Sequence, residues 1–269
     1  MKTILALEGI FVERSGTNIL QDVSWKVARG ENWAVFGPNG AGKSTLLSII
    51  TGYLWPTLGT VRVLGETLGQ VDLRKLRRHI ALVGDRLKEM MNPDLSGLHV
   101  IVSGGRAHLN IFEPPSKSEI RRAREIAEQT HLQDLANRQF AVMSTGERQR
   151  FLIARALMAE PEIVILDEPC AGLDLAGREF VLRTIDAVAA QPKAPALIFT
   201  THHAEEISPA FSHALLLSRG EVLEQGPMSH VFTSANLSRQ FGIEVSVRRT
   251  HGRWSAIAHA PNNEIARKD

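Results

Sequence analysis

A glycine-rich run holds the residues whose types and spacing point most directly to chemistry. It matches the pattern G-x-x-x-x-G-K-[ST] and reads Gly37, Pro38, Asn39, Gly40, Ala41, Gly42, Lys43, Ser44 and Thr45. Glycines let consecutive backbone N–H groups turn toward a phosphate chain, and a helix after the run directs its positive dipole end at the same anion. Lys43 can contact the β- and γ-phosphates, Thr45 the α-phosphate, and the Ser44 hydroxyl can bind Mg²⁺. The run therefore predicts a nucleotide-phosphate site.

A second pair of reactive residues, Asp167 and Glu168, follows four apolar residues at 163–166. Such an apolar run is typical of a buried strand, and ligands bind at the carboxyl ends of strands in open α/β sheets. Asp167 can hold Mg²⁺ directly or through water, and Glu168 can act as general base on an attacking water. Alone, such a pair is usually a solvated turn. Together with the glycine-rich run it predicts hydrolysis of a nucleotide.

A third segment, 143–150, places Ser144, Thr145, Gly146 and Glu147 before a helical run at 151–159. Ser144 and Glu147 have the spacing of a capping box, so the segment could serve simply to begin a helix. A helix N-terminus is also suited to bind a phosphate through its backbone N–H groups. These residues alone leave both interpretations open.

The same segment resembles the L-S-G-G-Q signature of ATP-binding cassette (ABC) ATPases. Downstream, the run from Ala171 to Asp174 resembles the D-loop of that family, and Thr201-His202 resembles its switch histidine. Five motifs in the family's order lie between residues 37 and 202, and the similarity extends over roughly residues 3–242. The chain is identified from these motifs as a member of the family.

Membership implies ATP and Mg²⁺ as ligands and a second cassette as partner. In the family, ATP lies between the phosphate loop of one cassette and the signature of another, so one copy of each motif implies a head-to-tail dimer. The site residues that the resemblance adds are Ser144, Thr145, Gly146, Glu147, Asp174 and His202. Of these, His202 would contact the γ-phosphate and Asp174 would couple the two sites, with His203 the adjacent alternative to His202.

Two positions depart from the family pattern. The strand at 80–83 is usually followed by a glutamine that senses Mg²⁺ and the membrane partner, and Asp85 stands there instead. A carboxylate can bind Mg²⁺ but cannot donate a hydrogen bond. An aromatic residue usually stacks on adenine, and the corresponding position is near Arg14, whose guanidinium can stack on a base. An exposed Arg14 without a role is the alternative, and Phe11 suits a packed strand better.

Apolar patterning indicates the elements that must position these residues. Nearly all-apolar runs at 33–36, 162–166 and 196–200 predict strands buried on both faces of a parallel sheet. Further strand-like runs lie at 4–7, 23–27, 60–64, 80–83, 214–217 and 221–225, and the runs around 61–63 and 222–223 fit an antiparallel context. Residues 85–145 show few strand signals and have capping-box spacing at Ser116 and Glu119, so they predict a helical insertion.

The elements together predict an α/β fold. We expect a P-loop NTPase core with a mostly parallel sheet, an antiparallel β layer and a helical subdomain inserted at about 85–145. One ABC ATPase domain is expected over 1–242. Residues 243–269 are basic and weakly patterned, and they are interpreted as a short C-terminal extension with one extra strand and a frayed tail.

Composition excludes several classes of protein. The chain has 269 residues, of which 43% are hydrophobic, and its net charge of +2 gives no electrostatic argument for nucleic acid as a partner. Its one cysteine, Cys170, excludes an intrachain disulfide, fits a reducing compartment and is expected to pack in the core. The N-terminus lacks the pattern of an export signal. The uncharged stretch 44–61 is interrupted by Gly52, Pro56 and Gly59, so it does not predict a membrane span.

These observations favour the ATPase subunit of a transporter, which powers a separate membrane permease from the cytoplasmic face of the cell membrane. Residues 104–108 faintly resemble a G-R-x-P-H segment of iron-chelate and cobalamin import ATPases. Residues 167–174 and 201–203 resemble a bacterial group linked to molybdate or iron-chelate uptake. We therefore expect an importer of such small cargo. The alternative is a soluble non-transport ABC ATPase with a regulatory or nucleic-acid-linked role, suggested by Asp85.

Overall fold

A six-stranded sheet forms the centre of the computed structural model, which describes residues 2–106 and 109–259, without the side chains of residues 85 and 86. Its strands, in spatial order, are β10 (Glu221–Pro227), β9 (His213–Ser218), β3 (Trp33–Phe36), β8 (Ala196–Thr201), β7 (Ile163–Asp167) and β6 (Ile80–Val83). All neighbours pair in parallel except β10, which is antiparallel to β9. The expected mostly parallel core is confirmed.

The strands of this sheet bury both of their faces. Trp33 and Val35 of β3 lie in one apolar cluster, whereas Ala34 and Phe36 lie in a second cluster on the other side. Successive side chains of a strand point to opposite faces, so a run that is apolar at every position needs a packed layer on each face. The sequence therefore requires three layers.

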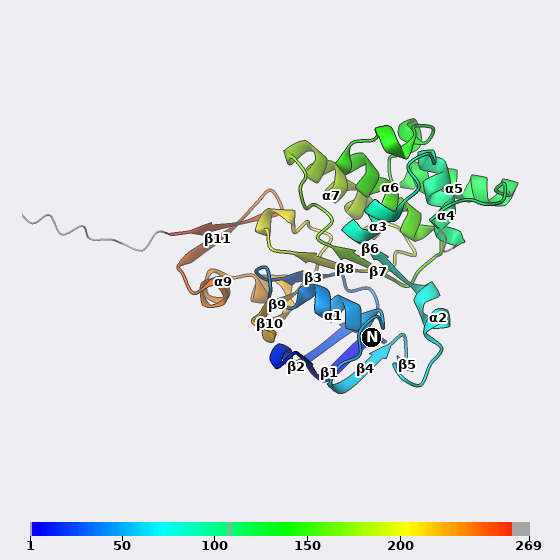
Figure 1. The fold of residues 1–269 in the computed structure, drawn as a ribbon. Helices are drawn as coiled ribbons and strands as arrows, with labels where there is room; N and C mark the ends of the chain where they lie inside the picture. Colours follow the sequence, from blue (N-terminus) through cyan, green and yellow to red (C-terminus); the bar gives the residue numbers. More distant parts are fainter. Residues whose placement is uncertain (1, 107–108, 260–269) are drawn as a thin grey trace, which may run out of the picture.

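One face of the sheet packs against α1 (Lys43–Ile50) and a four-stranded antiparallel sheet (Figure 1). The strands of that second sheet, in spatial order, are β2 (Thr17–Ala28), β1 (Thr3–Arg14), β4 (Leu58–Val63) and β5 (Glu66–Thr67). Leu46, Ile49 and Ile50 of α1 are fully buried between the sheets. The expected antiparallel layer is confirmed, and β1 and β2 run further than expected because register shifts let their pairing continue to Arg14.

Helices cover the other face (Figure 1). They are α3 (Asp85–Met90), α4 (Gly97–Gly105), α5 (Lys117–Gln129), α6 (Thr145–Leu157) and α7 (Leu175–Ala189), with short 3₁₀ turns η2 (Gln133–Leu135) and η3 (Phe140–Val142). The capping box of Ser116 and Glu119 is present at the start of α5. Within the described ranges, no helix is both long enough and apolar enough to cross a membrane.

Short elements join and extend these layers. α2 (Leu73–Leu76) and η1 (Arg77–His79) precede β6, η4 (Ala204–Glu206) follows β8, and α8 (Met228–Val231) and α9 (Ser234–Phe241) follow β10. A hairpin of β11 (Val245–Thr250) and β12 (Arg253–Ala258) comes next, where one extra strand was expected. Its Trp254 ring lies edge-on against Phe232, with ring centroids 5.2 Å apart.

The carboxyl ends of four neighbouring strands meet at one edge of the central sheet. β3 ends directly before Gly37, β7 ends at Asp167, and β8 ends at Thr201, directly before His202. β6 lies beside β7 and is followed by Gly84. Parallel pairing therefore brings segments separated by more than a hundred residues to one place, the edge at which open α/β sheets bind their ligands.

Candidate functional site

The glycine-rich run folds as a loop between β3 and α1. Gly42 caps α1 with a φ of 103°, a left-handed conformation that favours glycine. A Cβ atom at Gly37 would lie 2.2 Å from the Leu217 carbonyl oxygen, so a side chain there would displace the loop from β9. From α9, Gln240 Nε2 donates to the carbonyl oxygens of Phe36 and Leu217, 3.1 Å from each. The loop is thus fixed at its base from two sides.

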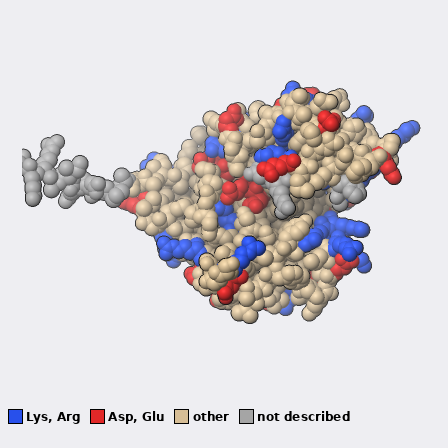
Figure 2. Space-filling view, viewed as in Figure 1, with Lys and Arg blue, Asp and Glu red and all other residues tan. Residues whose placement is uncertain are grey.

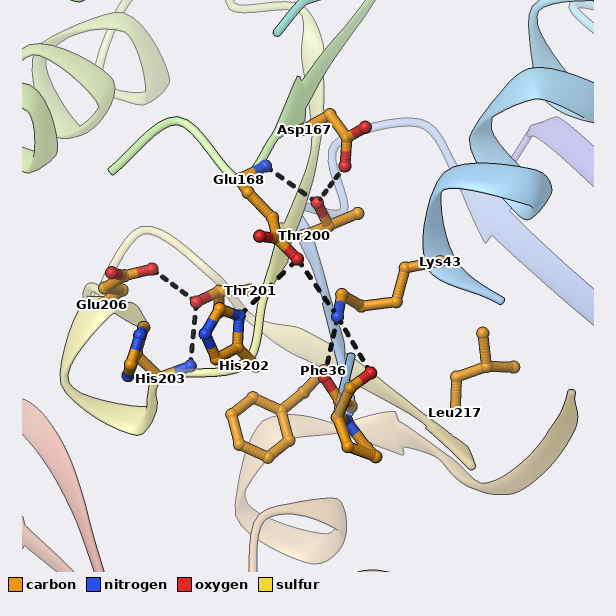
Figure 3. A network of polar contacts seen from close by, with 12 residues as sticks. Phe36, Lys43, Asp167, Glu168, Thr200, Thr201, His202, His203, Glu206 and Leu217 are labelled. Carbon is orange, nitrogen blue, oxygen red and sulfur yellow. Dashed lines mark hydrogen bonds and ion pairs between the residues drawn. The ribbon is translucent and has the colours of Figure 1, made fainter. Parts of the chain in front are cut away.

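Lys43 is 5% exposed, and its ammonium group is directed toward the end of β7 (Figure 3). Its Nζ donates to the Gly37 carbonyl oxygen at 2.8 Å and to that of Pro38 at 3.2 Å. The same Nζ forms an ion pair with Glu168 Oε1 at 3.2 Å. Lys43 therefore joins the loop to the carboxylate pair that follows β7.

Thr200 of β8 fixes both acidic residues. Its Oγ1 donates to Asp167 Oδ1 at 2.7 Å and accepts from the Glu168 backbone N–H at 3.0 Å (Figure 3). Glu168 has a φ of 44°, which is uncommon for a residue with a side chain and is held here by that contact. Sequence reasoning missed Thr200, because its contact depends on the register between β7 and β8.

A cavity of about 590 Å³ lies between the loop and the carboxylates. Its lining residues are Ile19, Asn39, Gly40, Gly42, Lys43, Ser44, Thr45, Asp167 and Glu168. The Ser44 hydroxyl and the Asp167 carboxylate are oxygen donors of the kind Mg²⁺ prefers, and Mg²⁺ commonly uses one or two carboxylates together with substrate phosphates. In the described part of the chain no group of three or more His, Cys, Asp or Glu side chains forms a metal cluster. This donor set fits an ion held jointly by the protein and a phosphate chain.

His202, rather than His203, faces the carboxylates. His202 Nδ1 lies 3.6 Å from Glu168 Oε1, and it is buried without a hydrogen-bond partner among the described residues. The His203 ring lies beside that of His202, with centroids 4.1 Å apart, on the side of Glu206 (Figure 3). The Glu168 carboxylate therefore has a lysine on one side and an imidazole on the other.

A second cavity, of about 640 Å³, lies at the start of α6 and α7. Its lining includes Ser144, Thr145, Gly146, Glu147, Gly172 and Asp174. A Cβ atom at Gly146 would lie 3.2 Å from Gly177 Cα, so the two helix N-termini approach closely there. In the part of the chain that the structure describes, this cavity shares no lining residue with the first.

Capping contacts hold the residues of the second cavity. Ser144 Oγ accepts from the Glu147 N–H at 3.2 Å, and Glu147 Oε2 accepts from the Ser144 N–H at 2.8 Å, so the capping box is present. Burial raises the pKa of Glu147, but hydrogen bonds from Ser144 and the Arg138 charge outweigh burial and leave that pKa lowered. Asp174 caps α7 by accepting from the Gly177 N–H at 2.7 Å. The Glu147 and Asp174 carboxylates thus fix two helix starts around the cavity.

Two residues from the sequence analysis are not brought to the first cavity by any described contact. Arg14 pairs with Thr17 at the end of the β1–β2 hairpin and does not belong to the lining, whereas Ile19 of the same hairpin does. Asp85 begins α3, which follows β6 and Gly84, but its side chain lies outside the described part of the structure, as do residues 107 and 108. Sequence reasoning missed Ile19, which has no polar group to mark it.

A third cavity, of about 740 Å³, lies between the helical layer and the segment around α2. Its lining includes Tyr53, Arg74, Arg77, Arg78, Gly104, Gly105, Arg106 and Leu109. Arg77 donates to the carbonyl oxygens of Thr51 and Gly52 and stacks over Tyr53, 4.1 Å from the ring centroid. Figure 2 shows the Lys and Arg side chains gathered over α2. This cavity is a basic groove, separate from the two described above.

Comparisons with known proteins place these features in one family. A family model described as ABC transporter matches residues 20–171. YlmA of Bacillus subtilis (strain 168), an uncharacterised ABC transporter ATP-binding protein, is 43% identical over 91% of this chain and 93% of its own. The cobalt import ATP-binding protein CbiO of Rhodobacter capsulatus is 33% identical over 90% of this chain and 85% of its own. A solved inward-facing ABC transporter of metal-chelate type has a TM-score of 0.77 and 27% identity, covering 96% of this chain and 98% of that one.

Proposed function

The chain belongs to the ABC transporter family as an ATP-binding subunit with ATPase activity, and from this premise we propose that its first two cavities are complementary halves of a shared ATP site. The observation that carries the proposal is their separation, because the phosphate loop and the signature-like segment line different cavities of one chain. In this proposal, one molecule does not enclose ATP between them. A head-to-tail pair of chains can, and two-fold symmetry then forms two such sites.

In the first half-site, the loop and Lys43 bind the phosphate chain. The backbone N–H groups at the start of α1 and the Lys43 ammonium supply positive potential, and Thr45 lies on the same wall. Ser44 and Asp167 would hold Mg²⁺, which neutralises phosphate charge when bound. Lys43 Nζ contacts two carbonyl oxygens and Glu168 simultaneously, so the protein itself fixes the position of the ammonium group.

Glu168 accepts the proton of the attacking water in this proposal. Its carboxylate forms an ion pair with Lys43 Nζ at 3.2 Å and lies 3.6 Å from His202 Nδ1, so these two side chains confine it. Thr200 prevents its backbone from relaxing out of the strained conformation. Ser144, Thr145 and Gly146 of the second chain would then complete the γ-phosphate site through their helix N-terminus.

The third cavity is proposed as the docking surface for the membrane subunit. Arginines from α2 and η1 rim this groove on one side, so that side complements an acidic cytoplasmic segment of a permease, whereas Arg106 on the other side is paired with Glu119. Docking there would hold the chain at the inner face of the membrane. Names of relatives that mention cobalt and metal chelates support a metal ion or metal complex as the imported cargo.

Complementation between two inactive variants tests the shared site. Lys43→Ala removes phosphate binding from the first half-site. Thr145→Glu keeps the Ser144 cap and places a negative charge in the second half-site, at the position where the γ-phosphate would bind. Each variant alone should hydrolyse ATP far more slowly than the wild type. An equal mixture should recover up to about a quarter of wild-type activity, because half of the dimers are mixed and each has one intact site.

The control is each variant alone, at the total protein concentration of the mixed sample. No recovery in the mixed sample, with both variants folded and mixed dimers present in ATP, would contradict the shared site. Full activity of Thr145→Glu by itself would contradict the role of the second cavity.

A further inference from the structure

A buried carboxylate lies one turn after the histidine that faces Glu168. Glu206, the last residue of η4, is 5% exposed, and the proposed hydrolysis does not use it. Carboxylates are rarely buried, and replacing a buried charged group by a well-packed apolar one is often neutral or stabilising. Stability of the fold is therefore a weak reason for a carboxylate at this position.

A hydroxyl group joins the Glu206 carboxylate to the backbone of His203. Thr201 Oγ1 donates to Glu206 Oε2, and it accepts from the His203 backbone N–H at 3.0 Å (Figure 3). A hydroxyl group has one proton and therefore donates in one direction at a time. Because the proton points to Glu206, a lone pair of Thr201 Oγ1 faces the His203 N–H. Glu206 thus fixes which way the hydroxyl accepts.

That acceptor sets the backbone path around His202. His202 lies between Thr201 and His203. The Thr201 hydroxyl group donates to Glu206 and accepts from the His203 backbone N–H. The Thr201 carbonyl oxygen also accepts from the Gly37 N–H at 3.3 Å, at the first residue of the phosphate loop. The turn that carries the imidazole is therefore pinned to β8 on one side and to Glu206 on the other.

Burial and the neighbouring polar groups act in opposite directions on the ionised form of Glu206. Burial is the largest effect and leaves the pKa of Glu206 raised, although the Thr201 hydrogen bond and the charges of His203 and Arg178 oppose it. Arg178 of α7 also pairs with Glu205 Oε1 at 3.3 Å, which ties η4 to that helix. The buried carboxylate therefore lies among polar and charged groups, on a turn whose His203 and Glu205 are exposed.

We propose that Glu206 is a positioning residue for ATP hydrolysis, which directs the His202 imidazole at Glu168 by orienting the Thr201 hydroxyl group. The inference rests on the proposed roles of Glu168 and His202. Glu206 touches neither nucleotide nor water in this scheme, and it acts through Thr201. Its loss should therefore slow the chemical step while leaving ATP binding to the phosphate loop unchanged.

Steady-state ATPase kinetics on the full chain test the proposal with three variants. Glu206→Leu removes the acceptor and should lower kcat about 10- to 100-fold, the usual effect of displacing a reacting group by about an ångström. The dissociation constant of a fluorescent ATP analogue should not change. Glu206→Gln keeps an acceptor oxygen and should recover most of kcat. Thr201→Val, which keeps the backbone bond to Gly37, should match Glu206→Leu, and the double variant should be no slower than either.

Glu205→Gln is the matched control. It alters the adjacent carboxylate, which pairs with Arg178 and makes no described contact with Thr201, so kcat should stay at the wild-type value. A wild-type kcat in Thr201→Val or Glu206→Leu overturns the proposal. A double variant whose loss of kcat equals the product of the two single losses also overturns it. If Glu206→Leu does not fold, Thr201→Val decides alone. Failure of the shared-site proposal would give a different result, namely no recovery of ATPase activity in the mixed-variant experiment.

Discussion

Among the residues proposed for the site, Glu168 is the most tightly constrained. It has a left-handed backbone conformation, and its carboxylate lies between Lys43 and His202. A strained residue persists where its surroundings over-determine it, and here Thr200 supplies the necessary contact. In the proposed mechanism, the charge of the carboxylate therefore matters in two ways, as the proton acceptor and as a negative neighbour of the phosphate chain.

Glu168→Gln separates these two effects. The amide cannot accept the proton, so ATP turnover should fall about 100-fold or more, within the range that general-base catalysis contributes. Loss of the negative charge should leave ATP binding equal or tighter. Rapid-quench hydrolysis and equilibrium binding of ATP measure the two quantities. Glu205→Gln is a control, and an undiminished hydrolysis rate in Glu168→Gln would show that another group accepts the proton.

At the residue scale, motif spacing predicted the loop and the carboxylates but could not predict their supports. A buried strand followed by Asp167 and Glu168 is visible in the sequence, because apolar runs indicate strands and strand ends indicate ligand edges. Thr200 reaches its partners through the register between β7 and β8, and Ile19 reaches the cavity through packing. Neither effect is set by residues that are neighbours in the sequence. Arg14 was matched to the base by family position, whereas the hairpin presents Ile19 to the cavity.

At the element scale, α5 shows how a helix start is fixed by charge. Glu119 completes the capping box with Ser116, and both its oxygens also accept from Arg106 of the neighbouring segment. The Arg106 hydrogen bonds, helped by those from Ser116, lower the pKa of Glu119 to about 2. The carboxylate is partly exposed, so solvent screening reduces the energy of this pair.

The lowered pKa predicts a pH dependence of stability. A group whose pKa is lower in the folded chain stabilises it fully above its ordinary value of 4.5, and that contribution is lost as the pH falls toward about 2. Glu119→Gln keeps the capping hydrogen bond and removes the charge. The free energy of unfolding should therefore differ between wild type and variant at pH 7, and the difference should shrink between pH 4.5 and 2.

Urea unfolding of both proteins across that pH range measures the difference. Glu125→Gln is a matched control on the same helix, because Glu125 pairs with Arg122 at a longer distance of 3.5 Å and with greater exposure. A constant difference between wild type and Glu119→Gln at all pH values would contradict the assignment.

Most elements could be predicted, and those that could not depend on distant packing. Residues 33–36 and 80–83 were predicted with their observed bounds, since consecutive apolar residues or clear alternation indicate strands. The β11–β12 hairpin was not predicted, because its sequence is basic and only weakly alternating. Its stability comes from Trp254 against Phe232 and from Arg253 Nη2 against Glu179 Oε2 at 2.8 Å. Neither partner is near in sequence.

At the scale of the whole molecule, the proposed ATP half-sites and the basic groove are separate surfaces. The groove is lined by arginines of α2, η1 and the helical layer, and none of the described residues that line it lines either half-site. A change in the groove should therefore affect partner binding without affecting ATP binding. Electrostatic complementarity mainly sets specificity and association rate, so reversal of one charge should suffice to show it.

Arg78→Glu should reduce recovery of the chain with the membrane fraction of its host cell, while affinity for ATP stays at the wild-type value. Sedimentation of membranes followed by quantification of the chain gives the first measurement, and equilibrium ATP binding gives the second. Lys26→Glu, an equal charge reversal at an exposed position of β2, is the control. Equal membrane recovery of the two variants would place the membrane partner elsewhere.

The packing of the β11–β12 hairpin has a practical consequence for anyone who shortens this chain. A cut after residue 242 matches the sequence-based domain boundary, but it would uncover the Phe232 ring and leave Glu179 of α7 without its arginine. Exposed aromatic surface promotes aggregation. Preparations intended for expression or crystallisation should thus extend through residue 258, and a purification tag is better placed beyond it.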